Sequence, residues 1–184
     1  MRNPVPQAAL FLLLACAPAF AAGDGSSGHI TEDAVRAFYQ KSVEVLKDPY
    51  ETYFDFMTKS LSDDFVSVTE MTATIPGQPP TKNTDHQTKE TLLQSARTAY
   101  DGSKEATVNS EVKDIVIAPN GKTATVTDET TIKGLGIPSG GGKMILGDSN
   151  SRCRDDLGLS SDGSIQITKS TCTVDLAISK GQSL

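Results

Sequence analysis

Apolar side chains recur every three to four residues in two consecutive segments near the start of the chain, 31–46 and 50–61. This spacing places them on one face of a helix, so the pattern predicts two amphipathic helices. Thr31 is the expected cap of the first helix, and Asp48-Pro49 is the expected start of the second. The recurring residues are Val35, Phe38, Tyr39, Val43 and Leu46, then Tyr50, Tyr53, Phe54, Met57 and Leu61.

A strand and a third helix are expected next. Residues 65–74 are rich in Val and Thr, which predicts a β-strand, and the Pro- and Gly-containing segment 75–80 predicts a loop. Thr84 and Gln87 have the spacing of a capping box. That spacing predicts a helix from Thr84 to about Tyr100.

From there the chain reads as long strands joined by short turns. Segments 108–118 and 122–133 flank Asn120-Gly121, a strong signal for a hairpin turn. In the first segment the apolar positions shift from even to odd numbers, which predicts a β-bulge or a bend. The Gly-rich segment 134–142 predicts a loop.

The last two expected strands, 144–160 and 164–178, carry a cysteine each. Cys153 and Cys172 lie symmetrically about Asp162-Gly163, because both pairs of residue numbers sum to 325. A two-residue turn at Asp162-Gly163 would therefore place the cysteines opposite each other. With no bulge between the turn and the cysteines, we expect a disulfide on the apolar face of this hairpin.

The first 22 residues are typical of a secretory signal peptide, with Arg2 at the charged start and an apolar core at 8–14. Cys16 gives a second reading, because Leu13-Leu14-Ala15-Cys16 is similar to a bacterial lipobox. In that reading the signal ends before Cys16, which becomes lipidated. Residues 23–29 would then form a flexible leader.

Both readings predict export, to the bacterial periplasm, to a lipid tether at the outer membrane, or into the medium. A disulfide between the two remaining cysteines fits such an oxidising compartment. No later segment approaches the roughly 18 apolar residues of a membrane-spanning helix. The net charge is −6 at pH 7 and the basic residues are scattered, so nucleic acid is not an expected partner.

Candidate catalytic groups are few. The two histidines, His29 and His86, fall in the leader and at an expected helix cap, so no metal site, cofactor or histidine-based triad is expected. Asp63-Asp64 and Asp155-Asp156 are adjacent carboxylates. Neighbours on a strand point to opposite faces, so we interpret both pairs as solvated charges and not as shared-proton dyads.

The order helix, helix, strand, helix and long strands, together with Leu61-Ser62-Asp63-Asp64-Phe65 before the first strand, resembles the nuclear transport factor 2-like superfamily. This superfamily includes SnoaL-like and ketosteroid isomerase-like proteins. The resemblance covers residues 30–180. It implies an α+β fold, a cone in which three helices pack on a strongly curved antiparallel sheet and enclose a pocket.

The resemblance also directs attention to particular residues. The acidic base of the isomerase-type enzymes falls on Thr69 here, with Glu70 one residue later and so on the opposite face. Tyr39 loosely matches the helix tyrosine of those enzymes. The residues that we expect to line a ligand site are Tyr39, Tyr53, Phe56, Thr69, Glu70 and Tyr100.

These observations favour a non-catalytic exported module that binds a small apolar molecule or an envelope protein. One alternative is a SnoaL-like or ketosteroid isomerase-like enzyme that uses Glu70 and Tyr39. Another is an assembly subunit of an envelope or secretion complex, and a homodimer is a further option.

Overall fold

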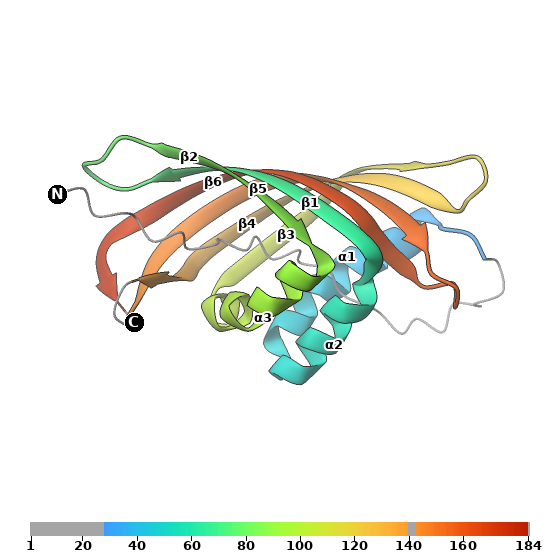
Figure 1. Ribbon diagram of the computed structural model, residues 1–184, viewed down its shortest axis with the longest axis horizontal. Helices are drawn as coiled ribbons and strands as arrows, with labels where there is room; N and C mark the ends of the chain where they lie inside the picture. Colours follow the sequence, from blue (N-terminus) through green and yellow to red (C-terminus); the bar gives the residue numbers. More distant parts are fainter. Residues whose placement is uncertain (1–27, 140–142, 184) are drawn as a thin grey trace.

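A computed structural model describes residues 28–139 and 143–183, and it contains three helices and one six-stranded sheet. The sheet arches over the helices, which all lie on its concave side (Figure 1). The helical elements are α1 (Glu32–Glu44), the 3₁₀ turn η1 (Val45–Lys47), α2 (Tyr50–Ser60) and α3 (Lys89–Ser103). The strands are β1 (Leu61–Thr74), β2 (Thr81–Thr88), β3 (Thr107–Ile117), β4 (Thr123–Ser139), β5 (Lys143–Leu159) and β6 (Ile165–Ser183).

The strands lie in the order β2-β1-β6-β5-β4-β3. The α+β class and the curved sheet are confirmed, but the expectation of a purely antiparallel sheet is wrong, because β1 pairs with β6 in parallel. The parallel pair arises because α3 carries the chain from the β1–β2 hairpin to β3, at the opposite edge of the sheet. The last strand then returns to lie beside β1.

The first helix begins as predicted, with the Thr31 side chain accepting a hydrogen bond from the amide of Ala34. The predicted start of the third helix is wrong. Residues 81–88 form strand β2, and the capping box is made by Thr88 and Thr91. β2 pairs with β1 from Thr81 to Thr88, and this ladder of backbone hydrogen bonds outweighs one helical turn of polar residues.

Most of the predicted Gly-rich loop 134–142 is strand, and its residues 140–142 lie outside the described residues. β4 continues to Ser139, and Gly134, with φ of 72°, sits in a bulge between Ile132 and Leu135. A glycine at positive φ is what such a bulge requires. The bulge predicted in β3 is confirmed, because its register with β4 shifts between Val112 and Asp114.

The main apolar core lies between the helices and the concave face of the sheet. α1 packs over β3, α2 contacts β6 and β1, and α3 lies against β4, β1 and β2. The largest side chains that are almost completely buried belong to Tyr53, Phe65, Leu61, Ile132, Leu157 and Ile167. This core holds the helices against one part of the concave face. The neighbouring part of that face carries buried polar side chains.

The last hairpin places Cys153 opposite Cys172, as predicted, but by a different turn and with a bulge that was not predicted. The turn has three residues, 161–163, closed by hydrogen bonds between Ser160 and Ser164, with Gly163 at φ of 85°. That turn alone would misalign the cysteines by one residue. An extra residue at Thr168 forms a bulge between turn and cysteines, and the two offsets cancel.

Candidate functional site

A group of buried polar side chains crosses the middle of the concave face. Alternate residues of a strand share a face, and the strand registers align these residues into neighbouring rows. We call this group the polar island. Its members are Ser67, Asp128, Thr130, Ser149, Ser151, Asp155 and Ser170.

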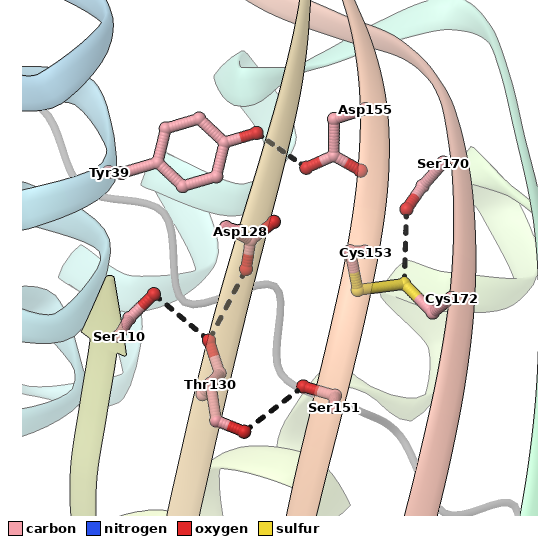
Figure 2. The surroundings of a disulfide bond; sticks show 9 residues. All are labelled: Tyr39, Ser110, Asp128, Thr130, Ser151, Cys153, Asp155, Ser170 and Cys172. Carbon is pink, nitrogen blue, oxygen red and sulfur yellow. Dashed lines mark hydrogen bonds between the residues drawn. A yellow bond between two sulfur atoms is a disulfide. The ribbon is translucent and has the colours of Figure 1, made fainter. Parts of the chain in front are cut away.

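Asp155 is an almost completely buried member of the polar island, with 1% of its surface exposed. α1 positions Tyr39 above it, and the tyrosine hydroxyl donates a 2.5 Å hydrogen bond to Asp155 Oδ2 (Figure 2). Burial raises the pKa of Asp155 to about 6, although the nearby hydroxyl groups of Ser170 and Tyr39 act in the opposite direction. Tyr39 therefore stabilises the charged form of a carboxylate that burial disfavours.

Asp128 lies on the neighbouring strand, diagonally across from Asp155, because its register partner is Cys153. The Thr130 hydroxyl lies 3.4 Å from Asp128 Oδ2 and 2.9 Å from Ser110 Oγ. Burial and the nearby negative charge of Asp155 raise the pKa of Asp128 to about 8. At neutral pH the two carboxylates therefore favour a state in which the pair retains a proton.

Three buried oxygens of the polar island have no hydrogen-bond partner among the described residues: Asp128 Oδ1, Asp155 Oδ1 and Ser149 Oγ. Within residues 28–139 and 143–183, neither aspartate forms an ion pair. A buried carboxylate without a cation costs several kcal/mol on an order-of-magnitude scale. The folded chain thus offers unused acceptors at a place where stability alone would favour apolar side chains.

The predicted disulfide joins Cys153 to Cys172 in the same region, with a Cα–Cα distance of 4.1 Å. This distance is close to the narrow, non-hydrogen-bonded spacing of an antiparallel pair, about 4.5 Å. Both cysteines are buried, as expected for the apolar face, and the Ser170 hydroxyl lies 3.4 Å from Cys172 Sγ. The disulfide therefore forms part of the lining of the polar island (Figure 2).

The structure separates the two residues of the predicted isomerase-like pair. Tyr39 points to the concave face, whereas Glu70 is exposed and pairs with Thr173 on the outer face. Thr69 is half-buried on the concave face, opposite Cys172. An enzyme that uses Glu70 with Tyr39 is therefore not supported by the geometry.

The other aromatic candidates pack within the helical layer. Tyr53 is buried and stacks on Tyr100 with ring centroids 5.4 Å apart, and Phe56 packs against Phe38. The Tyr100 hydroxyl donates to the backbone carbonyl of Asp48. These contacts are those of core aromatics, and none of them involves the polar island. Cys16 lies outside the described residues.

Asp128 and Asp155 are the site residues that sequence reasoning missed. The interpretation of Asp155-Asp156 as a solvated pair is wrong for Asp155, which is buried, while half-buried Asp156 accepts a hydrogen bond from Thr125. A signal was present, because Asp155 stands between Cys153 and Leu157 on the apolar phase of its strand. Asp63-Asp64 is exposed as predicted, with Asp63 paired to Lys89.

Among residues 28–139 and 143–183, no group of three or more His, Cys, Asp or Glu side chains is arranged to hold a metal ion. In the same part of the chain, no helix has the length and apolar character needed to cross a membrane.

Neither a protein-family model nor a curated protein matches this sequence. Solved structures do match. A conserved protein from Planctomyces limnophilus DSM 3776 has a TM-score of 0.56 at 19% identity, over 78% of this chain and 94% of that chain. LinA has a TM-score of 0.50 at 12% identity, over 82% and 90%. An NTF2-like protein from Cytophaga hutchinsonii ATCC 33406 has a TM-score of 0.47 at 18% identity, over 78% and 98%.

These identities are low, so the likeness is one of fold. The chain has the nuclear transport factor 2-like fold that its order of elements resembles. That fold is shared by ligand-binding proteins and by enzymes, so the function has to be argued from the polar island.

Proposed function

We propose that this chain is an exported, non-catalytic module that binds a small molecule at the polar island. The observation that carries the proposal is the buried pair Asp128 and Asp155, each with one oxygen that lacks a partner among the described residues. Replacing a buried charged group by well-packed apolar residues is often neutral or stabilising. Stability alone therefore does not explain why these oxygens are buried, whereas a ligand that forms hydrogen bonds with them does.

The surroundings of the pair suit a ligand with an apolar body. Val126 is the register partner of Asp155, Val112 is the register partner of Asp128, and Val174 lies beside the disulfide. A small molecule fits this place better than a protein partner, because no residue of the polar island is more than 7% exposed. The polar end of the ligand would meet the aspartates, and its apolar part would lie along the valines.

Export is supported by the signal-like first 22 residues and by the disulfide. A disulfide persists in an oxidising compartment such as the periplasm or the exterior of the cell. The proposed ligand would accordingly be a molecule met outside the cytoplasm.

The test is a screen of a small-molecule library by amide NMR with the purified, oxidised protein. We expect hits to shift the amide signals of the polar island, and Asp155→Asn to weaken their binding. Asp156→Asn is the matched control, because this neighbouring carboxylate lies on the other face of the same strand. The proposal is wrong if no compound perturbs the island, or if both variants weaken binding equally.

A second candidate function is acid–base catalysis, favoured by one specific observation. The pKa values of Asp128 and Asp155 are raised unequally, to about 8 and about 6, beside the Tyr39 hydroxyl. Carboxylates with separated pKa values are typical of acid–base pairs. Turnover of any compound that binds the island, lost in Asp128→Asn, would establish an enzyme and overturn the non-catalytic assignment.

A further inference from the structure

The two aspartates of the polar island lack a positive counterpart. The described ion pairs of β4 and β5 involve Glu129 and Arg152, which lie on the outer face. Arg36 of α1 reaches the edge strand β3, where it donates to the carbonyl of Val112 and is itself exposed. The negative pair therefore has no cationic partner among the described residues, although each carboxylate keeps an unused oxygen.

We propose that the polar island binds an organic ammonium ion, a protonated amine on an apolar body, whose N–H groups donate to Asp128 and Asp155. This inference rests on the proposed binding function and adds the chemical class of the ligand. An ammonium group carries up to three N–H donors and no acceptor, which complements acceptors that lack donors. It also supplies the positive charge that burial of two carboxylates requires.

The geometry allows one ammonium to reach both carboxylates. Asp128 is paired with Cys153, and Asp155 is two residues further along β5, so the aspartates are diagonal neighbours on one face. Such neighbours have Cβ atoms roughly 7–8 Å apart or somewhat less. A charge-assisted hydrogen bond of about 2.8 Å to each side chain can span this gap. In Figure 2 the carboxylates of both residues lie on the side of the sheet that faces Tyr39.

The exposure of the pair indicates the side from which a ligand would reach it. Asp128 retains 6% of its surface, whereas Asp155 retains 1%. Next to Asp128, the side chains of Ser110 and Val112 on β3 are only half-buried. The ammonium would therefore meet Asp128 first, and its apolar body would remain against the half-buried rim.

Other ligand classes fit this arrangement less well. Divalent calcium takes six to eight oxygen ligands, and magnesium demands a near-octahedral set. The described residues offer two carboxylates and no third His, Cys, Asp or Glu in a metal-binding group. A neutral hydrogen-bond donor would satisfy one oxygen but would bring no positive charge to the buried pair.

An ammonium ligand has a consequence that a neutral ligand lacks. Without a ligand, mutual repulsion and burial favour a proton on the pair. A bound cation favours the ionised form of both carboxylates, so it displaces that proton into solvent. Binding near pH 7 should therefore release up to one proton per molecule.

The experiment compares benzylamine with benzyl alcohol, two probes of similar shape that differ in charge. Binding is measured by calorimetry at about pH 7 in phosphate and in Tris, and the site is located by amide NMR. We expect benzylamine to bind the polar island at least about tenfold more tightly, the difference between a charge-assisted and a neutral hydrogen bond. We also expect its binding heat to differ between the buffers in the sense of proton release.

Asp128→Asn should remove the preference for the amine, and Glu129→Gln, on the outer face of the same strand, should retain it. Equal or tighter binding of benzyl alcohol at the island overturns the ammonium inference and leaves the proposed binding function standing. Amine binding that shifts only outer-face amides also overturns the inference. Failure of the whole library to perturb the island overturns the proposed function and the inference with it. The two-probe comparison uses the unmodified protein, so it does not depend on the folding of a variant.

Discussion

At the scale of single residues, Asp128 and Asp155 occupy inward positions that a curved sheet normally fills with apolar side chains. Their neighbours along the same phase are Val126 on β4 and Leu157 on β5, both buried in the core. Burial and mutual repulsion make the proton affinity of the pair differ between the folded and unfolded states. The stability of the protein must then depend on pH through these two residues.

The first prediction follows from the direction of that difference. The pKa of Asp128 is raised from 3.8 to about 8 on folding. The folded protein therefore binds a proton that the unfolded chain releases, and the free energy of unfolding falls as pH rises from about 4 to about 8. Asp128→Asn, a neutral isostere, should reduce the fall between about pH 5 and about pH 9 by at least about 1.4 kcal/mol, the equivalent of one pKa unit.

Urea unfolding of both proteins across this pH range provides the measurement. Asp175→Asn is the control, because Asp175 is exposed on the outer face of β6, and this variant should keep the wild-type pH dependence. The pair would not be buried as described if wild-type stability rose through this range, or if Asp128→Asn left its slope unchanged.

Sequence reasoning could find Tyr39 but not its partner. Tyr39 lies at a helical spacing with other apolar residues, so its burial followed from the pattern. Asp155 also lay on the apolar phase of its strand, beside Cys153, but its charge and its neighbour Asp156 favoured a solvated reading. Asp128 could be recognised as a site residue only once the register of β4 with β5 was known. That register brings it close to Asp155, which is 27 positions away in the sequence.

At the scale of elements, α3 is held against β4 by a contact between two glycines. A Cβ atom on Gly102 would lie 2.4 Å from the carbonyl oxygen of Gly136. Glycine here allows the backbone of the helix to approach the backbone of the strand. The helix lies on the concave side of the sheet (Figure 1).

The second prediction is that Gly102→Ala destabilises the protein. In an open helix this change would stabilise it by about 1 kcal/mol, so a loss reports the backbone contact. Overpacking of this kind costs about 1–3 kcal/mol, measured as a lower urea midpoint at unchanged slope. Gly158→Ala is the control, since its new methyl would meet only the Thr168 methyl, at 3.4 Å. A Gly102→Ala variant as stable as the wild type would show that α3 does not dock this closely.

Elements with a strong internal pattern were predicted well, and elements defined by their partners were not. α1 and the β3 bulge followed from apolar periodicity. β2 has few apolar residues and exists as a strand because β1 offers it a ladder of hydrogen bonds. Gly134 suggested a loop, but pairing with β5 makes it part of a bulged strand.

At the scale of the whole molecule, the order of elements was enough to predict the fold class, while the mixed pairing was not visible. β1 and β6 are separated by about half of the chain, and their parallel pairing depends on how the chain crosses the open sheet between them. The cysteine register was predicted correctly although the turn and the bulge were not. Only the sum of the two offsets decides which residues face each other.

The third prediction concerns the mature N-terminus. We expect a protein expressed with its natural leader in a Gram-negative host to be cleaved, and mass spectrometry to find one of two products. Cleavage by signal peptidase would give a chain that begins near Ala22, and lipidation would give a diacylglyceryl group on Cys16. Cys16→Ala separates the two, because it abolishes only the lipidated product. Intact Met1 in the exported fraction, or retention of all protein in the cytoplasm, would contradict export.

The last prediction is that the disulfide adds stability without setting the register. Cys153 and Cys172 are separated by 19 residues, and a loop of this size corresponds to about 3 kcal/mol in the unfolded-chain model. The Ser160–Ser164 turn and the Thr168 bulge already align the strands by backbone hydrogen bonds. Replacing both cysteines by Ala should therefore lower the free energy of unfolding by about this amount and keep the amide spectrum of the polar island outside the two substituted positions. Reductant should destabilise the wild type alone. A changed spectrum of Asp128 and Thr130 in the variant would instead assign the disulfide a role in shaping the site.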